Sequence, residues 1–370
     1  TNDGLLNVMI DYNGNTESIS RSIPIVLNKI SLSLYPEGGD LVNGLENNVA
    51  FKALNEFGKP ADVEGIVLTQ KGSRVCAFSS YHQGMGAFKI NPQPGERYKV
   101  KITKPEGIKE EYTVPEALDR GYILSVDNTQ ADRLGISVGS TETEEMSLVA
   151  QVRGKLVYAT AFSVAPGTNT FCFATEQLPA GVCQVTIFDS KNIARAERLC
   201  FVNRDKQMNI SVETEKEKYL PRDKVRMTIS VKDVRGMPMP ANLSMAVVND
   251  QLLAFADDKS GNIVSQMLLQ QDLREKVEEP AFYFNKKEPK SFKALDYLLM
   301  TSGWRRFTWE KLIEQDLPPI THQPELSLVG GKVINAMNNM PVKNTAIKCS
   351  DGRAILCDEK GLFSFPHTDL

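Results

Sequence analysis

The chain has 370 residues, of which 41% are hydrophobic and 24% are charged. This composition is typical of globular proteins and excludes a disordered or collagen-like chain. The 43 basic and 46 acidic residues give a net charge of −3. The chain therefore lacks the basic surplus of most nucleic-acid-binding proteins, and we expect no nucleic-acid partner.

The length and the distribution of apolar residues indicate a multi-domain chain outside the membrane. A chain of 370 residues is too long for one all-β core and predicts about two to four domains. No apolar run approaches the roughly 18 residues that a membrane-spanning helix needs. Thr1 opens with neither the basic region nor the apolar region of a signal peptide. We expect a soluble piece of a longer protein, with no membrane span in this fragment.

The six cysteines are too few and too scattered for a disulfide scaffold, and none forms a CxxC pair of the zinc-binding kind. Cys183 and Cys200 flank the turn-like stretch 189–194, so a hairpin could place them opposite each other. A register shift of one residue would send them to opposite faces of the sheet. A disulfide and a pair of small buried thiols therefore both remain open.

Apolar and polar residues alternate along several segments, which is the pattern of antiparallel strands with one buried face. Turn-forming residues bound each segment within about ten residues. The alternating apolar positions are Val49, Phe51 and Ala53, then Val185 and Ile187, then Val225, Met227, Ile229 and Val231, and finally Phe363 and Phe365. Short strands at this spacing predict a mainly β fold of tandem, immunoglobulin-like antiparallel β-sandwiches.

Two kinds of turn recur along the chain. The first combines an Asx residue, a Gly or Asn and a closing Pro, in residues 55–60, 233–238 and 335–341. Its Asx side chain can bond the backbone two residues on, and Gly or Asn can take a positive φ. The second kind feeds an aromatic residue into a core, in residues 84–88 and 358–363. Their irregular separation predicts related domains rather than a strict repeat.

Polar and Pro-rich stretches suggest where domains meet. We expect residues 1–28 to be closing strands of a preceding domain, residues 29–115, 116–204 and 205–320 to be three β-sandwiches, and residues 321–370 to be a partial one.

A helical insertion at about residues 252–315 is expected to lie on the third sandwich. Its clearest helix starts with Ser291 as N-cap and stops at Gly303. The apolar positions of that helix are Phe292, Leu295, Leu298 and Leu299, and a further turn or two is indicated by Ile263, Met267 and Leu268.

One catalytic motif has a literal match, the GxSxG pattern of a hydrolase nucleophile elbow at Gly135-Ile136-Ser137-Val138-Gly139. Such an elbow needs a strand-to-helix turn, yet no apolar helix period follows this stretch. Ile136 and Val138 on either side of Ser137 favour an ordinary strand. An esterase that uses Ser137 is the alternative.

Histidines and paired carboxylates give little support to a metal or acid–base site. His82, His322 and His367 fall in three different predicted domains, whereas metal binding and catalysis need histidine near its partners. The neighbouring pairs Glu144-Glu145 and Glu278-Glu279 favour solvated surface. No P-loop or dinucleotide motif is present. We expect no metal, no cofactor and no enzymatic activity.

An aromatic and cationic cluster is the one candidate for binding. Residues 304–309 contain Trp304, Arg305, Arg306 and Trp309, and Trp and Arg are concentrated at interface hot spots. The alternative is that the rings pin the helical insertion to its sheet, because Phe307 alternates with polar neighbours as a core strand does.

Several stretches together resemble the macroglobulin-like multi-domain proteins of Gram-negative bacterial envelopes. These stretches are SIPIVL (22–27), YPEGGDLV (35–42), GMGAF (84–88), PGERY (94–98), LPAG (178–181), AERL (196–199), YLPRDKV (219–225), LDYLL (295–299) and GWRRF (303–307). The stretches LVGGKV (328–333) and DEKGLFSF (358–365) are similar to the start of a carboxypeptidase regulatory-like β-sandwich. In that family such a domain often precedes the plug of a TonB-dependent receptor.

The resemblance implies macroglobulin-like sandwiches in a non-catalytic scaffold or ligand-recognition arm, located in the periplasm or at the outer-membrane surface. It also implies a link to TonB-dependent uptake of an unknown protein or nutrient ligand. The alternative is a protease inhibitor similar to α2-macroglobulin, because LSMAVVND (243–250) resembles the strand before its bait segment. No cysteine is followed by Gly-Glu-Gln, so this fragment lacks the thioester of such inhibitors.

Overall fold

The computed structural model describes residues 4–12, 15–23, 28–247, 261–303, 328–335, 338–348 and 354–366. The described residues confirm a mainly β fold of several antiparallel sheets, with helices only between residues 263 and 300. The chain divides into two compact units, residues 1–310 and residues 311–370. The finer domain boundaries expected from the sequence stay predictions.

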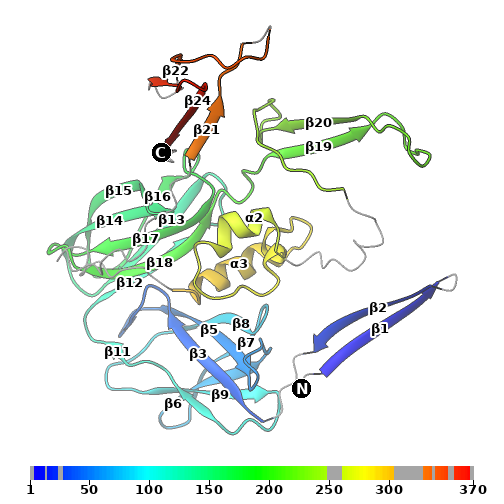
Figure 1. Ribbon diagram of the computed structural model, residues 1–370. Helices are drawn as coiled ribbons and strands as arrows, with labels where there is room; N and C mark the ends of the chain where they lie inside the picture. The colour runs from blue at the N-terminus through cyan, green and yellow to red at the C-terminus, as the bar shows by residue number, and fades with distance from the viewer. Residues whose placement is uncertain are drawn as a thin grey trace. The chain divides into compact units, whose positions relative to one another are not determined.

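The first sandwich packs a three-stranded sheet against a four-stranded sheet (Figure 1). The three-stranded sheet has the order β3 (Ile30–Pro36), β5 (Asn47–Asn55) and β8 (Met85–Ile90). The other has the order β10 (Glu111–Thr113), β9 (Tyr98–Lys104), β6 (Glu64–Thr69) and β7 (Arg74–Ser79). Val49, Phe51 and Ala53 are fully buried in its core, as their alternation predicts.

The second sandwich follows a short parallel pair, β4 (Leu41–Val42) with β11 (Ala117–Leu118). Its three-stranded sheet has the order β12 (Tyr122–Asp127), β13 (Arg133–Ser140) and β16 (Gly167–Ala174). The opposite sheet has the order β15 (Lys155–Val164), β14 (Glu144–Val152), β17 (Gly181–Phe188) and β18 (Ala194–Val202). Val185 and Ile187 are fully buried between the sheets, as predicted.

Cys183 and Cys200 face each other directly in the antiparallel pair of β17 and β18. Both side chains are fully buried and both are free thiols. The hydrogen bond with Cys183 and burial together raise the pKa of the Cys200 thiol well above its ordinary value. The expected hairpin is therefore present, and of the two alternatives the structure shows the buried thiols.

The predicted turns form through the expected side chains. The Asn55 carboxamide accepts hydrogen bonds from the amides of Phe57 and Lys59, and Gly58 takes a φ of 72°. The Asp233 carboxylate makes the equivalent pair of bonds to Arg235 and Met237. An Asx residue thus satisfies two backbone donors at each turn.

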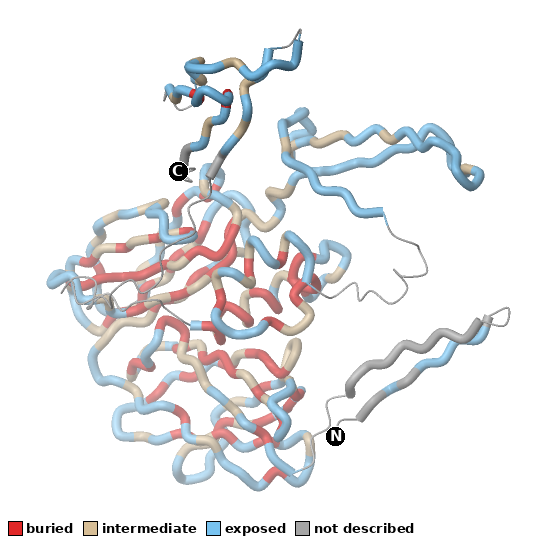
Figure 2. Tube along the Cα trace, in the orientation of Figure 1, coloured by how far each residue is buried: buried red, intermediate tan, exposed pale blue. Residues whose placement is uncertain are grey.

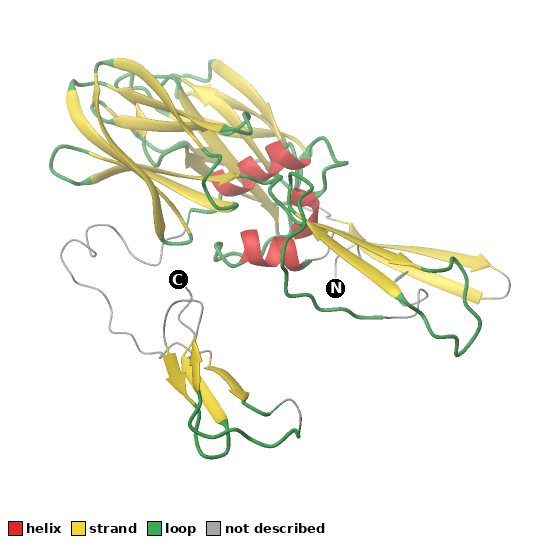
Figure 3. Cartoon of the chain, turned by 90° about the horizontal axis from the view of Figure 1, so that it is seen from above, coloured by secondary structure: helices red, strands yellow, loops and turns green. Residues whose placement is uncertain are grey.

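The helices of the described residues form one small group (Figure 3). Its elements are α2 (Ile263–Ser265), the π-helical turn η1 (Gln266–Gln270), the 3-10 helix η2 (Pro280–Phe284) and α3 (Ser291–Met300). Helix α3 buries Leu295, Leu298 and Leu299, as predicted.

Two details of the helical prediction are wrong, the N-cap of α3 and the sandwich that the helices cover. The N-cap of α3 is Lys290, and Ser291 lies inside the first turn, where its hydroxyl donates to the Asn285 carbonyl oxygen at 3.0 Å. The further turns indicated by Ile263, Met267 and Leu268 are present as α2 and η1, in which Ile263 and Met267 are exposed and Leu269 is buried. The helices pack against β18 and β8 of the first two sandwiches, because those strands present the apolar surface that the helices cover.

The hairpin of β19 (Asn209–Thr214) and β20 (Met227–Lys232) has no buried residue (Figure 2). Its apolar residues share one face, since Ile210 pairs with Val231 and Val212 pairs with Ile229. The alternation correctly predicts a strand here, but the expected burial is wrong for the described residues because only two strands pair. Strands β1 (Gly4–Tyr12) and β2 (Asn15–Ile23) form a second two-stranded hairpin.

The described residues of the unit 311–370 form two antiparallel strand pairs. Strand β21 (Leu328–Lys332) pairs with β24 (Leu362–Pro366), and β22 (Ala346–Lys348) pairs with β23 (Ala354–Leu356). The predicted strand of Phe363 and Phe365 is present, and the Asp358 carboxylate closes the turn before it by accepting from the amides of Lys360 and Leu362.

Candidate functional site

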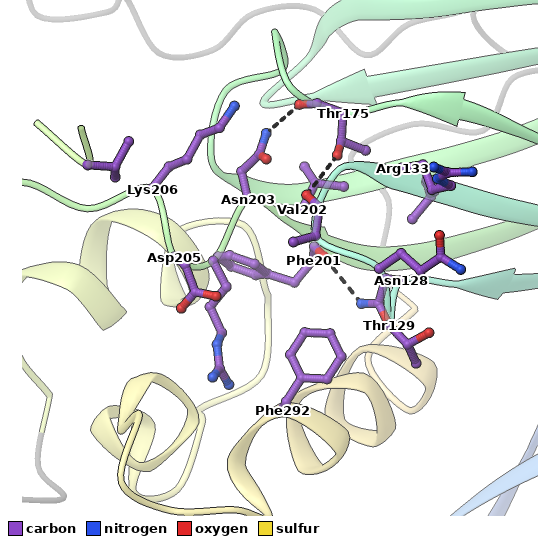
Figure 4. Close-up of a pocket in the computed structure, with 15 residues that line it drawn as sticks. Asn128, Thr129, Arg133, Thr175, Phe201, Val202, Asn203, Asp205, Lys206 and Phe292 are labelled. Atoms are coloured by element: carbon purple, nitrogen blue, oxygen red, sulfur yellow. Dashed lines mark hydrogen bonds between the residues drawn. The ribbon is translucent and has the colours of Figure 1, made fainter.

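An open cleft of about 430 Å³ lies at the end of β18 (Figure 4). The turn between β12 and β13, residues 128–131, forms one wall, and Thr175 after β16 lies nearby. Residues 203–206, which leave β18, form a second wall, and Phe292 of α3 closes the base. A cavity of this size falls within the usual range of ligand sites.

Asn203 and Asn128 present fixed carboxamides in this cleft. Asn203 adopts a φ of 55°, and its Nδ2 donates to the carbonyl oxygens of Thr175 at 2.8 Å and Leu178 at 2.7 Å. Both amide hydrogens are thereby used, so the Oδ1 atom is left to accept. Asn128 Nδ2 donates to the Phe201 carbonyl oxygen at 3.2 Å. The two amides are held by main-chain atoms and cannot turn freely.

Arg204 is a half-buried cation held by neutral oxygens. Its Nη1 donates to Ser291 Oγ at 3.1 Å and to the Tyr283 carbonyl oxygen at 3.4 Å. Its Cζ lies 5.2 Å from the centroid of the Phe292 ring, within range of a cation–π contact. Burial lowers the pKa of Arg204, and Asp205 opposes that effect only in part. Among the described residues no carboxylate forms an ion pair with Arg204.

The other charges around the cleft already have partners. Arg133 is 3.4 Å from Asp132, and Asp205 is 3.5 Å from Lys286. Lys206 Nζ donates to the Glu176 carbonyl oxygen. Arg204 and Lys206 are therefore the two cations of the cleft that are held by neutral oxygens.

Close to the cleft, a buried ionic group joins three parts of the chain. Arg198 of β18 donates through Nε to Glu37 Oε1 at 2.8 Å and through Nη2 to Asp296 Oδ1 at 2.8 Å. Glu37 follows β3 of the first sandwich, and Asp296 belongs to α3. The side chains of Arg198 and Glu37 are 3% and 4% exposed, and that of Asp296 is 23% exposed. We call Glu37, Arg198 and Asp296 the ionic joint.

Neighbouring side chains also bond the second carboxylate oxygen of Glu37. Glu37 Oε2 accepts from Ser125 Oγ at 2.7 Å and from Asn48 Nδ2 at 2.9 Å. Burial alone would lower the pKa of Arg198, but the Asp296 and Glu37 carboxylates raise it above its ordinary value. Arg198 thus stays charged while it is buried.

One apolar core continues across the same contact. Met85 of β8, Val182 of β17 and Phe201 of β18 share a buried cluster with Tyr283 and Leu295 of the helices. The ring of His82 stacks on Phe282 with centroids 3.9 Å apart, and Phe201 meets Phe284 edge-on at 5.5 Å. The helices between residues 263 and 300 therefore contact both sandwiches, and we call this group of helices the wedge.

The described residues that were candidates for catalysis or metal binding do not lie together in one site. Ser137 lies in the middle of β13, paired with Ser125 and Thr170, so the stretch is the ordinary strand that its flanks favour. His82 is part of the helical interface, and His322 and His367 lie outside the described residues. No three His, Cys, Asp or Glu side chains in the described part of the chain could hold a metal ion together.

The paired carboxylates make ordinary surface contacts. Glu144 accepts from the Tyr122 hydroxyl and from Ser190 Oγ at 2.7 Å, and Glu145 accepts from Ser163 Oγ. Glu278 lies 3.7 Å from Lys59 in an exposed pair. None of these contacts converges on the cleft.

The proposed binding residues Trp304, Arg305, Arg306 and Trp309 lie outside the described residues and stay a prediction. Sequence reasoning missed the cleft, because residues 203–206 fall where the predicted domains 116–204 and 205–320 meet and carry no motif of a binding site. It also missed the ionic joint. The available signal was a charged residue on the apolar face of a strand, as Arg198 is between Ala196 and Cys200.

No family model matches the chain, and no curated protein does. Solved structures similar to it include domains 4–9 of the surface layer protein SbsC, at 12% identity and a TM-score of 0.32, with 64% of this chain and 42% of that chain covered. The BSP domain of a biofilm-associated protein is 15% identical with a TM-score of 0.26, with 46% and 29% covered. The native α2-macroglobulin of Escherichia coli is 10% identical with a TM-score of 0.19, with 62% and 19% covered.

This chain therefore spans less than half the length of each of these three proteins. At such identities and TM-scores the similarities assign it neither a family nor a function. Among the described residues, no helix has the length and apolar composition needed to cross a membrane.

Proposed function

We propose that this chain is a non-catalytic, ligand-recognition arm of a bacterial cell-envelope protein, built from macroglobulin-like β-sandwiches. The observation that carries the proposal is the wedge of helices, which ties two sandwiches into one body beside an open cleft. The cleft presents amides and a cation held by main-chain and hydroxyl oxygens, and such fixed groups suit binding. The envelope location rests on the sequence resemblance.

The finer part of the proposal is a link to TonB-dependent uptake. It rests on the resemblance of residues 328–365 to the start of a carboxypeptidase regulatory-like domain. In this role the sandwiches would present a captured ligand to an outer-membrane receptor. Cross-linking of intact cells followed by purification of the protein should recover a TonB-dependent receptor. Absence of any such receptor would remove this link and leave the recognition arm.

Cell fractionation tests the envelope role itself. An antibody raised against the 370-residue chain should detect the protein in the periplasmic or outer-membrane fraction of the bacterium that encodes it. A cytosolic enzyme and an outer-membrane porin serve as fraction markers. Detection in the cytosolic fraction would contradict the proposed function.

The protease-inhibitor alternative makes a different prediction about the helical segment. An inhibitor needs an exposed bait that proteases cleave, whereas Leu269, Tyr283 and Phe284 are buried. Limited digestion with chymotrypsin should therefore leave residues 264–284 intact, because proteolysis requires local opening of a packed segment. Mass spectrometry of the fragments locates the cuts. Early cleavage within 264–284, followed by a large change in hydrodynamic radius, would favour the inhibitor.

A further inference from the structure

We propose that the cleft at the end of β18 binds a carboxylated sugar of the hexuronate type, with Arg204 receiving the carboxylate. This inference rests on the proposed ligand-recognition role and names its ligand class. Three features of the cleft carry it: the sign of its charge, the geometry of Arg204, and the acceptor atoms around it.

The charge of the cleft is opposite to that of the chain. Arg133, Arg204 and Lys206 line it together with a single acid, Asp205, whereas the whole chain has a net charge of −3. Since Arg133 and Asp205 have partners of opposite charge, the attraction for an anion comes from Arg204 and Lys206, and of these two only Arg204 has a planar guanidinium that a carboxylate can pair with through two bonds.

Two hydrogen bonds hold the guanidinium of Arg204 in place and leave other N–H donors for a ligand. Both of its hydrogen bonds to described residues leave from Nη1, toward Ser291 and Tyr283. The N–H groups of Nε and Nη2 make no hydrogen bond within the described part of the chain. A carboxylate can accept from this edge of a guanidinium through two parallel bonds. A carboxylate stabilises a half-buried cation more than an exposed one, because burial has removed part of the hydration of the cation.

The neighbouring groups suit hydroxyls and the apolar face of a ring. Asn203 offers Oδ1 as an acceptor because its Nδ2 is committed twice to backbone carbonyls, and Asn128 is held in a similar way. Figure 4 shows the Phe292 ring rising from α3 toward Asn128 and Thr129. Sugar hydroxyls can donate to the amide oxygens while the C–H face of the ring packs on Phe292.

Titration of the full chain with three small ligands tests the inference. D-glucuronate carries the carboxylate and the hydroxyls, D-glucose carries only the hydroxyls, and N-acetyl-L-glutamate carries two carboxylates on a peptide-like group without hydroxyls. Two-dimensional NMR or calorimetry in about 0.15 M salt measures the three dissociation constants. We expect glucuronate to bind saturably and at least about tenfold more tightly than glucose, since a lost charge-assisted bond costs about that factor. It should also bind about tenfold more tightly than acetylglutamate, which lacks the hydroxyls that donate to the amide oxygens.

Variants of the full chain assign the binding to the cleft. Arg204→Gln should weaken glucuronate binding about tenfold or more while leaving the weak binding of glucose unchanged. Arg204→Lys retains the charge but lacks the bidentate edge, so an intermediate loss is expected. Arg204→Lys also tests the role of Arg204 if Arg204→Gln does not fold. Arg226→Gln removes an arginine whose exposed partner is Glu215, and should change nothing.

Four results would overturn the inference: equal binding of glucose, equal binding of acetylglutamate, no binding of glucuronate at tens of millimolar, or unchanged binding by both Arg204 variants. Equal binding of acetylglutamate would assign the cleft to acidic peptides instead. The titrations decide only whether the cleft binds a hexuronate. The proposed function is decided separately, by the cell fraction in which the protein is found.

Discussion

Replacing Arg198 with Met should lower the free energy of unfolding of the two-sandwich body by about 3–5 kcal/mol. Arg198 compensates two carboxylates, and Glu37 is almost completely buried. Without the guanidinium, the buried Glu37 carboxylate would lose its partner of opposite charge in an environment that hydrates it poorly. The measurement is urea denaturation followed by circular dichroism. The transition that reports the two sandwiches is compared between variants, because a multi-domain chain can unfold in several steps.

Two further variants give this prediction its controls. Arg226→Met breaks an exposed pair with Glu215 and should cost no more than about 1 kcal/mol. The triple variant Glu37→Gln, Arg198→Met and Asp296→Asn removes every charge of the ionic joint. It should recover much of the stability lost in Arg198→Met, because no buried charge is left uncompensated. If Arg198→Met costs no more than Arg226→Met, the ionic joint does not hold the sandwiches together.

The parts of the fold that could be predicted from the sequence are those set by neighbours along the chain. Alternation identifies β5 and β17, since every second side chain of a strand points to the same face. Asn55 and Asp233 form their turns with amides two and four residues away. The periodicity of Leu295, Leu298 and Leu299 identifies α3. Each of these signals is contained within about ten residues of sequence.

The ionic joint and the cleft depend on contacts that no local pattern contains. Glu37 and Arg198 are 161 residues apart, and Arg198 and Asp296 are 98 residues apart. Residues 203–206 look like a polar linker until Ser291 and Phe292 are placed beside them. Likewise, alternation identifies the apolar face of β20 but does not say what covers it, and its partners among the described residues leave Ile210 and Ile229 exposed.

Phe201→Ala should be the second severe change, with a loss of about 3–5 kcal/mol in the same unfolding transition. Phe201 is 2% exposed, lies in the core shared by β18 and the helices, and meets Phe284 edge-on. Removal of the Phe201 ring leaves a cavity between β18 and the helices, so the helices should separate from β18 more often. Chymotrypsin should then cut within residues 264–284, which it spares in the unmodified chain.

Phe57 provides the matched control, because it is the same residue type but is 39% exposed in a turn. Phe57→Ala should change the free energy of unfolding by no more than about 0.5 kcal/mol and should create no new cut. The combination of a large loss with new cleavage in Phe201→Ala would show that burial of the helices against β18 stabilises the body. A loss as small as that of Phe57→Ala would mean that burial of the helices contributes little to the stability of the two-sandwich body.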